Sequence, residues 1–399
     1  MIATGPLWSA GGRALPRLVG PHRADICVVG LGGSGLSALE ALLPAARAGR
    51  RIIGLDARGV AAGAAGRNGG FLLAGPAEPY AEARARLGDA ARSLYELTLE
   101  GLDRLFSTLK HADRSGGLRI PGDPEELEAL RVELEALHAD GFEAEWRTAS
   151  PEARLGGRFG AELGLRIPVE GVFDPALRCA QLAAAVEGSI SLFGESPVQA
   201  LEPERVRTAH GEVRAEVVLV LVDGRLEQLV PSLAKRIRSL RLQMLATAPA
   251  SDVRIEGAVY HRRGFDYWQQ RPDGRIALGG GRDLGGEAEE TSALGVSEAV
   301  QAGLETLLRG TIGTRAPVTH RWSGIVAYSE DGLPIVEETQ PGVLVGGAYS
   351  GHGNVLGALA GRALAELALG RPEPELCRTL RAARFILSEK RQSSPELLS

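Results

Sequence analysis

The sequence predicts an α/β protein in which a nucleotide-binding domain with a parallel sheet, assembled from separate pieces of chain, is combined with a second, β-rich domain. Three observations predict this class. A strand, a glycine-rich turn, a helix and a second strand follow one another over residues 24–56. A further strand, glycine-rich turn and helix span 342–370. Between them, residues 237–282 read as strands joined by turns, which is typical of an inserted sheet.

The remaining elements follow from hydrophobic periodicity and turn residues. Helices are expected over 82–109, 124–141, 175–188, 296–308 and 355–370. Strands are expected over 116–122, 189–193, 206–209, 216–222, 238–249, 264–272, 275–281, 319–328 and 342–347. The strand 216–222 is almost purely Val and Leu, as expected of a strand covered on both faces. Asp273-Gly274 predicts a hairpin turn, while the stretch after Pro151 reads as loop-rich and the residues after about 388 as a frayed tail.

The composition is that of a globular protein long enough for two domains. The chain has 399 residues, of which 44% are hydrophobic, and its formal net charge is −5. Because this slight acidity provides no basic surface, we expect no nucleic-acid partner. The apolar stretches are interrupted well before the roughly 20 residues that a bilayer demands, so we expect no membrane span.

The three cysteines, Cys27, Cys179 and Cys377, are far apart and form no Cys-x-x-Cys pair. They predict neither a disulfide framework nor a thiolate metal site, and we expect no bound metal. The first twenty residues lack a continuous apolar core, so we interpret them as an arm rather than a signal peptide. Together these features predict a cytoplasmic protein.

The turn after the first strand has the pattern Gly-x-Gly-x-x-Gly at Gly30, Gly32 and Gly35, with Gly33 and Ser34 between them. Gly30 permits the tight turn, Gly32 lets the backbone approach a pyrophosphate, and Gly35 allows the helix to pack closely on the strand. The N-terminus of the helix supplies N–H donors and partial positive charge for that anion.

Asp56 ends the second strand, where its carboxylate would accept hydrogen bonds from ribose hydroxyls. The alternative is an ordinary turn acid. Ala57 and Arg58 follow and complete this candidate site. Arg58 raises the question of a 2′-phosphate, but an acid at the strand end favours a free 2′-hydroxyl and therefore FAD or NAD.

A second glycine-rich segment, GAAGRNGG at 63–70, follows too soon for another helix, and its small residues let the backbone pass against a flat ring. With this segment the chain resembles the glycine oxidase/D-amino acid oxidase superfamily of FAD-dependent oxidoreductases, most closely its γ-glutamylputrescine oxidase branch. Further motifs of that family, in the same order, are GGLRIPG at 116–122, GVFDP at 171–175, PDGRIALGGG at 272–281, HRWSG at 320–324 and YSGHG at 349–353.

The resemblance implies a glutathione-reductase-type FAD fold with a β-sheet-rich substrate domain. It implies non-covalent FAD, since position 67 is Arg rather than His and no Cys lies near 325–328. On this basis we predict an arm at 1–23, FAD-binding segments at 24–85, 149–225 and 323–387, substrate-domain segments at 86–148 and 226–322, and a tail at 388–399.

The resemblance also implies further cofactor contacts. It places 63–70 against the flavin, Val198 beside the adenine, and the helix start near 351–353 at the flavin edge that becomes negative on reduction, where a helix dipole favours the reduced form. The predicted contacts are Gly66, Arg67, Asn68, Gly69, Gly70, Val198, Gly324, Gly351, His352, Gly353, Asn354 and Val355.

The same resemblance implies that the substrate lies between the flavin and the second sheet. The candidate catalytic residues are Tyr267, Gln269, Tyr328 and His352, with Trp322 as a further candidate contact; an ordinary core position is the alternative for each aromatic residue, and a structural, hydrogen-bonded imidazole the alternative for His352. Amino-acid oxidases of the superfamily carry an Arg shortly after the W-x-G motif, which clamps the substrate α-carboxylate. Here Gly324 is followed by Ile-Val-Ala-Tyr, so we expect an amine without an α-carboxylate.

We therefore expect an enzyme that oxidises the C–N bond of a small-molecule amine, γ-glutamylputrescine-like or similar, by hydride transfer to flavin N5. O2 or another electron acceptor would reoxidise the flavin, and O2 would give an imine or aldehyde and H2O2, so that an oxidase is favoured over a dehydrogenase. A second hypothesis is a glycine- or sarcosine-type amino-acid oxidase with its clamp supplied by Arg262, Arg263 or Arg282. A third is a catalytically silent FAD-binding protein, because residues 221–225 depart from the small residues usual in relatives.

Overall fold

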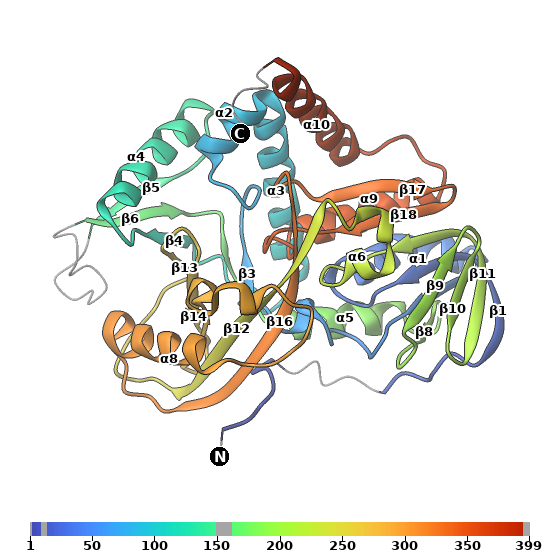
Figure 1. Cartoon of the computed structure of the whole chain (residues 1–399), viewed down its shortest axis with the longest axis horizontal. Coiled ribbons are helices and arrows are strands. Elements are labelled where there is room, and N and C mark those ends of the chain that lie inside the picture. Colours follow the sequence, from blue (N-terminus) through green and yellow to red (C-terminus); the bar gives the residue numbers. More distant parts are fainter. Residues whose placement is uncertain (1, 9–13, 149–161, 394–399) are drawn as a thin grey trace.

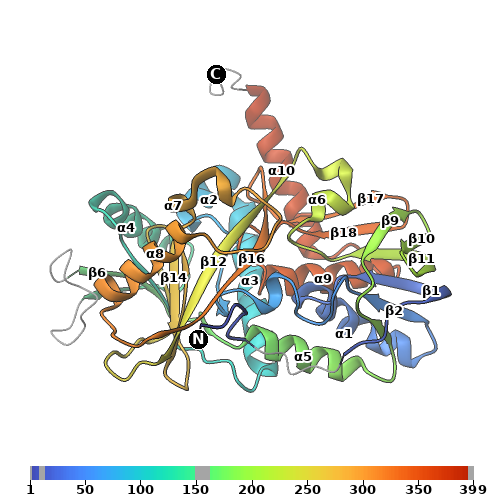
Figure 2. The same ribbon diagram turned by 60° about the horizontal axis from the view of Figure 1, so that its bottom comes forward.

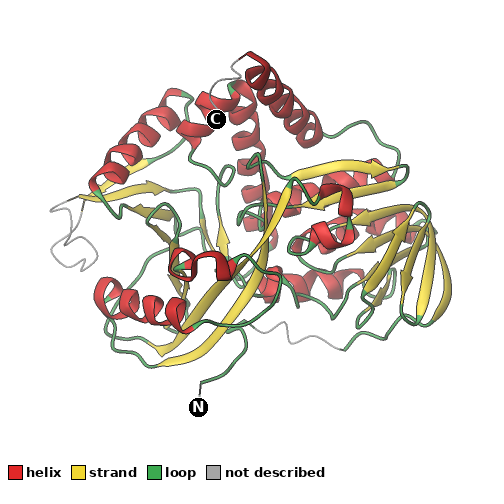
Figure 3. Ribbon diagram, in the orientation of Figure 1, coloured by secondary structure: helices red, strands yellow, loops and turns green. Residues whose placement is uncertain are grey.

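The computed structural model describes residues 2–8, 14–148 and 162–393, which form two large sheets with helices packed against them (Figure 1). The predicted α/β class is confirmed. Figure 3 shows the strands of both sheets in yellow and the helices that lie against them in red. Most of the loop-rich stretch predicted after Pro151 lies outside the described residues.

The first sheet is mainly parallel and contains the predicted nucleotide-binding unit. Its order is β17 (Ile335–Gln340), β18 (Val343–Gly347), β11 (Gly211–Val220), β1 (Gly20–Val29), β2 (Ile52–Leu55) and β8 (Ser191–Phe193). Only β17 in this order is antiparallel to its neighbour. Strands β9 (Val198–Glu202) and β10 (Arg205–Thr208) extend from β11 as an antiparallel flap.

Both faces of this sheet are buried. Successive side chains of a strand point to opposite faces, so alternate residues of β1 join different cores. Ile26 and Val28 join a core with the helices α1 (Gly33–Arg47) and α9 (Leu356–Ala368), whereas Cys27 and Val29 join a second core on the other face. Helix α5 (Pro175–Val186) packs on α1, and Figure 2 shows α1, α5 and α9 gathered on one side of the parallel strands.

The second sheet is mainly antiparallel. Its order is β16 (Val318–Ser329), β12 (Ile237–Pro249), β15 (Arg275–Gly280), β14 (Asp266–Gln270), β13 (Ala258–His261), β4 (Gly117–Ile120), β6 (Glu162–Ile167) and β5 (Glu145–Thr148). Helix α8 (Glu298–Leu307) packs on β12 and β15, and α4 (Pro124–Ala139) on β6. A ribbon of β3 (Phe71–Leu72) and β7 (Gly171–Val172) stands apart.

The remaining helices are α2 (Tyr80–Leu87), α3 (Asp89–Thr108), α10 (Glu375–Ser393) and the short α6 (Leu226–Leu229) and α7 (Arg282–Gly285), with 3-10 or π turns η1 (Ala64–Gly66), η3 (Pro231–Leu233), η4 (Gly286–Glu289) and η5 (Leu308–Ile312). Helix α10 packs against α3. The parallel strands β1, β2, β11 and β18 are followed at their carboxyl ends by the glycine turn, Asp56, Asp223 and Ala348, respectively. This is the edge at which such sheets bind ligands.

Several boundaries differ from the sequence predictions. The helix expected over 82–109 is two helices, because Gly88 adopts φ +58 between them. The tail expected after about 388 was wrong as far as Ser393, since α10 continues to that residue. Strand β1 begins at Gly20, inside the predicted arm, because it pairs with β11 along its whole length. Strands β3, β5, β6, β7, β9, β13 and β17 were not predicted, and β16 continues past the predicted domain boundary at 323 within the second sheet.

Candidate active site

The glycine turn has the geometry that its sequence predicts. Gly30 has φ +105, a conformation that glycine alone adopts readily, and its N–H donates to the carbonyl of Leu55 at 2.7 Å. A Cβ on Gly35 would overlap the carbonyl oxygen of Gly30, so only glycine allows this approach of helix to strand. No side chain caps the N-terminus of α1, which leaves its first N–H groups to bind an anion.

Asp56 braces the same turn. Its Oδ2 accepts the N–H of Leu31 at 3.0 Å, and its Oδ1 accepts the N–H groups of Arg58 and Gly59 at 2.8 Å. A carboxylate has about four acceptor sites, so capacity for ribose hydroxyls remains. The carboxylate therefore fits a nucleotide and fixes the loop that would hold it.

The adjoining candidates Ala57, Arg58 and Val198 lie near this end of the sheet. Ala57 and Arg58 are exposed, and the guanidinium of Arg58 donates to the carbonyl of Ala62 at 2.8 Å. The N–H of Ser196 donates to the carbonyl of Asp56 at 3.0 Å, which brings the start of β9, and with it Val198, beside Asp56. These positions are compatible with the predicted adenine end of the site.

The segment 63–70 is tied to strand β16. Arg67 donates from Nη1 to the carbonyl of Ser323 at 3.0 Å, and Trp322 donates from Nε1 to the carbonyl of Arg67 at 2.9 Å. A Cβ on Gly324 would lie 3.3 Å from that of Arg67. Trp322 is thus a buried support for the segment and does not line the cavity described below, contrary to its candidacy as a substrate contact.

The same segment is tied to the chain before α9. The side-chain amides of Asn68 and Asn354 pair with each other at 3.2 Å, and Asn354 also donates to the carbonyl of Phe71 at 2.9 Å. Gln269 donates to the carbonyls of Gly69 and Gly70 at 2.5 and 2.9 Å. Gln269 is buried and does not line the cavity. Its hydrogen bonds support the backbone of 69–70, which does not fit its predicted catalytic role.

The turn 348–353 carries His352. Ala348, Ser350 and Gly351 all have positive φ, and α9 begins just beyond, at Leu356 after the buried Val355. Burial, together with the nearby cation of Arg119, lowers the pKa of His352 to about 4. Its ring lies parallel to that of Tyr260 at 6.3 Å, and its buried Nδ1 has no hydrogen-bond partner within the described part of the chain. A neutral imidazole with an unused nitrogen fits a bound group at this turn, as predicted for the flavin edge.

A cavity of about 820 Å³ opens where these segments meet. The predicted cofactor contacts that line it are Arg67, Asn68, Gly69, Gly324, Gly351, His352, Asn354 and Val355, and its lining also includes Tyr260, Tyr267, Tyr328 and Arg282. Tyr267 and Tyr328 thus line the cavity, and their catalytic roles stay predictions. The edge of Tyr267 would contact a Cβ on Gly69 at 3.1 Å, which brings the second sheet directly against 63–70.

A buried ion pair supports this wall. Both guanidinium Nη atoms of Arg119 on β4 contact the fully buried carboxylate of Glu170, with Nη2 and Oε1 2.7 Å apart. Glu170 also accepts the N–H of Ala74 at 3.0 Å. Arg119 lies over the ring of Tyr260 at 5.8 Å, so the pair fixes one of the cavity's aromatic side chains.

The departure at 221–225 has a structural explanation. The side chain of Asp223, just after β11, accepts the N–H groups of Ala327 and Tyr349, both at 3.2 Å. It thereby joins the first sheet to β16 and to the turn that carries His352. Burial raises the pKa of Asp223 to about 6, although hydrogen bonds from the backbone of Tyr349, Ala327 and Ala348 oppose the rise.

Because the folded protein binds this proton more tightly than the unfolded chain, Asp223 stabilises the fold at low pH and loses that contribution as the pH rises through about 6. We expect Asp223→Asn to gain stability relative to the wild type, by on the order of 2 kcal/mol, between pH 4.5 and 7.5. Urea unfolding of both proteins at several pH values measures how their difference in stability changes with pH. The altered hydrogen bonds add a cost that does not change with pH. Asp25→Asn, whose carboxyl has a lowered pKa, should show no such gain in this range, and a parallel response of the two variants would contradict the prediction.

Sequence reasoning missed four residues of this region: Trp8, Arg119, Tyr260 and Asp223. Trp8 is buried and donates from Nε1 to the carbonyl of Asn68 at 2.7 Å, while Arg271 lies 4.8 Å above its ring. A single tryptophan in an arm of mainly small and aliphatic residues was the available signal. Arg119 lies in the GGLRIPG motif and Asp223 in the departure at 221–225, but neither pattern shows the distant partners through which these residues and Tyr260 act.

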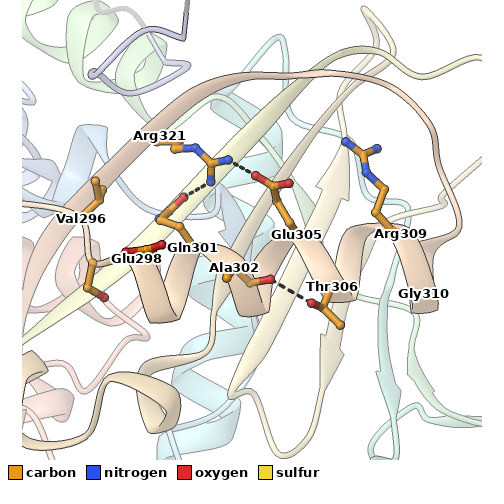
Figure 4. A pocket seen from close by; sticks show the side chains of 10 residues that line it. Val296, Glu298, Gln301, Ala302, Glu305, Thr306, Arg309, Gly310 and Arg321 are labelled. Carbon is orange, nitrogen blue, oxygen red and sulfur yellow. Dashed lines mark hydrogen bonds and ion pairs between the residues drawn. The ribbon is translucent and has the colours of Figure 1, made fainter.

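A second hollow, of about 900 Å³, lies along α8 on the flank that faces Arg321 of β16, and is open to solvent (Figure 4). Its lining comes mainly from α8 and the following turn, with Arg321 at the edge. Arg321 is already paired with Glu305 and donates to Gln301 at 2.6 Å. Apart from Arg321 of the HRWSG motif, the motifs discussed above do not contribute to this hollow, and the cavity at 63–70 is the candidate active site.

The other expectations concern metal, membrane and cysteines. Within 2–8, 14–148 and 162–393, no group of three or more His, Cys, Asp or Glu side chains is placed to hold a metal ion. Among the helices that the structure describes, none is both long and apolar enough to cross a bilayer. All three cysteines are free and buried.

Fold and site together define a dinucleotide-binding protein in which the glycine-rich segments 63–70 and 348–353 border a large cavity beside the second sheet. The chain belongs to the FAD dependent oxidoreductase family, DAO, which it matches over residues 25–367. The resemblance to this superfamily is confirmed, and the protein is an FAD-dependent oxidoreductase that acts on amines or amino acids.

Among curated proteins, the chain is similar to γ-glutamylputrescine oxidoreductase of Escherichia coli, with 27% identity over 88% of this chain and 84% of that protein. It is also 25% identical to a probable oxidoreductase, OrdL, of Haemophilus influenzae, over 90% of this chain and 86% of the relative.

Solved structures share the fold. Glycine oxidase from Geobacillus kaustophilus superposes with a TM-score of 0.72 at 19% identity, covering 88% of this chain and 96% of its own. L-proline dehydrogenase from P. horikoshii gives 0.73 at 17% identity, covering 92% and 98%. At these identities the likeness concerns the fold alone.

Proposed function

We propose that the protein oxidises the C–N bond of an amine that is not held by an α-carboxylate clamp on β16, with γ-glutamylated amines as the leading substrate class. The observation that carries this proposal is the wall of the cavity after Gly324. Residues 325–328 are Ile, Val, Ala and Tyr, and Tyr328 presents an uncharged ring to the cavity. The similarity to a γ-glutamylputrescine oxidoreductase supports the substrate class.

The described residues fit FAD as the cofactor. The uncapped start of α1 would bind the pyrophosphate, Asp56 the ribose, and 63–70 with 351–354 the ring system. When bound, FAD supplies a two-electron acceptor for the hydride that leaves the carbon next to nitrogen. We propose that it is held without a covalent bond.

The protein's part in the reaction is to orient the amine and keep it neutral. Tyr260, Tyr267 and Tyr328 form an aromatic wall, and burial raises the pKa of each phenol, so all three remain uncharged. His352 is also uncharged above pH 5, because its pKa is lowered to about 4. These uncharged side chains offer an ammonium ion no partner, and the cation of Arg282 in the same lining disfavours that ion further. The neutral amine, whose nitrogen lone pair is needed for oxidation, is therefore favoured.

A mixing experiment tests the proposal. The holoenzyme is mixed without oxygen with primary, secondary and γ-glutamylated amines, and the absorbance of oxidised flavin is followed. We expect γ-glutamylated amines to bleach this band fastest and glycine or sarcosine slowly or not at all. If glycine or sarcosine is faster, the amino-acid oxidase is the correct function, and if no amine bleaches the band, amine oxidation is wrong.

The acceptor and compartment are also proposals. We propose that O2 reoxidises the flavin, which peroxide release during turnover would measure; turnover only with an artificial dye would instead indicate a dehydrogenase. The three free, buried cysteines support a reducing, cytoplasmic environment.

A further inference from the structure

Arg282 occupies an unusual place in the cavity wall. It follows β15 at the start of α7, is half-buried, and lines the cavity. Its guanidinium lies 4.9 Å from the ring centre of Phe265 and 5.0 Å from that of Tyr328. Two aromatic rings therefore hold the planar group in one orientation at little further entropic cost.

The charge of Arg282 is not neutralised by the protein. Among the residues that the structure describes, it makes no ion pair and donates no hydrogen bond to another side chain or carbonyl. The nearby acids are already used, because Arg262 binds Asp266 at 2.6 and 3.0 Å and Asp283 at 2.8 Å. The same pairing removes Arg262 as a ligand for substrate.

The other cavity arginines are less suitable. Arg67 donates from Nε to the carbonyl of Ala62 and from Nη1 to that of Ser323, which ties its guanidinium to the backbone, and Arg119 is paired with Glu170. Arg263 is exposed, so water and salt would screen an ion pair formed there. Arg282 is the cation whose donors are free, whose orientation is held and whose surroundings are partly shielded from water.

We propose that Arg282 binds a carboxylate of the amine substrate. A guanidinium matches a carboxylate with two parallel N–H to oxygen bonds, and aromatic neighbours leave its edge available for them. Tyr328, which stacks on Arg282, also lies beside the turn 348–353, since its hydroxyl would be 3.7 Å from a Cβ on Gly351. Tyr328 thus lies between Arg282 and the turn 348–353. A substrate whose carboxylate binds Arg282 would extend along Tyr328 towards that turn. The inference rests on the proposed amine oxidation and assigns its substrates a negative charge.

The first test compares substrates with and without that charge. Flavin bleaching by the holoenzyme is measured for 4-aminobutanoate, 6-aminohexanoate and γ-glutamylputrescine, each against its uncharged carboxamide. For each carboxylate that acts as a substrate, we expect the wild type to bleach about tenfold or more faster than with the matching carboxamide. Arg282→Gln should lose this preference. Arg282→Lys, which keeps the charge without the planar fork, should restore part of it. The spacing with the largest preference measures the separation between the amine and the carboxylate.

Arg275→Gln is the matched control. Arg275 is the first residue of β15, the strand that leads to Arg282. It lies outside the cavity lining, with its Nε 3.8 Å from the carboxylate of Asp273. This variant should keep the wild-type preference. Equal bleaching by acids and amides in wild type, or an unchanged preference in Arg282→Gln, would overturn the proposal.

A binding measurement separates this inference from the proposed function. Butanoate and butanamide, which contain no amine to oxidise, are titrated into the holoenzyme while the flavin absorbance is followed. We expect butanoate, but not butanamide, to shift the band in wild type, with about tenfold weaker binding in Arg282→Gln. If no amine bleaches the flavin but this difference holds, amine oxidation fails and carboxylate binding by Arg282 stands; if butanoate and butanamide bind alike, Arg282 has no such role.

Discussion

Gly35→Ala should yield a folded protein that no longer retains FAD. The added methyl would overlap the carbonyl oxygen of Gly30, a rigid backbone atom at the centre of the turn, so the turn must move away from α1. The N–H groups expected to bind the pyrophosphate move with it. We expect FAD affinity to fall by about 100-fold or more, which corresponds to roughly 3 kcal/mol.

Titration of the apoprotein with FAD, followed by flavin fluorescence, measures this loss, and circular dichroism checks that the fold persists. Gly310→Ala is the control, because a Cβ there has no atom within 4 Å and the backbone needs no positive φ. A Gly35→Ala protein that purifies with one FAD per chain would show that the turn does not hold the cofactor in this way.

The second large effect is on stability. Glu170→Ala should lower the free energy of unfolding by about 3–5 kcal/mol, because it leaves the guanidinium of Arg119 buried without its partner. The side chain of Glu170 is 0% exposed and that of Arg119 only 19%. The N–H of Ala74 also loses its acceptor. Tyr260 and the cavity wall should loosen, since Arg119 lies over that ring.

Chemical denaturation gives the size of the effect, and the double variant Glu170→Ala/Arg119→Met gives its cause. Removing both charges should recover much of the loss, because the unpaired buried cation is then gone. Glu202→Ala, which breaks the exposed pair with Arg207, should cost less than about 1 kcal/mol. If the double variant is no more stable than Glu170→Ala, desolvation of Arg119 is not the reason for the loss.

The parts of the fold that local sequence determines were predictable. Strand β1, the glycine turn, α1 and β2 occupy 36 consecutive residues, from Gly20 to Leu55, and each step has its own local signal. The hairpin at Asp273-Gly274 is similar, with Gly274 at φ +80. Helix α10 could also have been predicted, because its buried residues Leu376, Cys377, Leu380 and Ala383 follow a helical spacing within the charged stretch.

The site was predictable only where a motif carried it. Residues 63–70 and 348–355 were marked by glycine, and they do lie together, joined by Asn68 and Asn354. The sequence could not show that Gln269 supports the backbone instead of facing the cavity, because strand alternation does not say which face meets the flavin. Nor could it show that Arg262 is occupied and Arg282 free, since that depends on Asp266 and Asp283 reaching the same guanidinium.

The N-terminal arm has a consequence for how the molecule is completed. Ala3 exchanges backbone hydrogen bonds with Thr319 and Arg321 at 2.8 and 3.0 Å, and Trp8 contacts Asn68. The partners of Ala3 on β16 lie more than three hundred residues further along the chain. Contacts between such distant segments close a long loop and therefore cost much chain entropy. The arm can thus support the 63–70 segment from this position only when β16 is already in place.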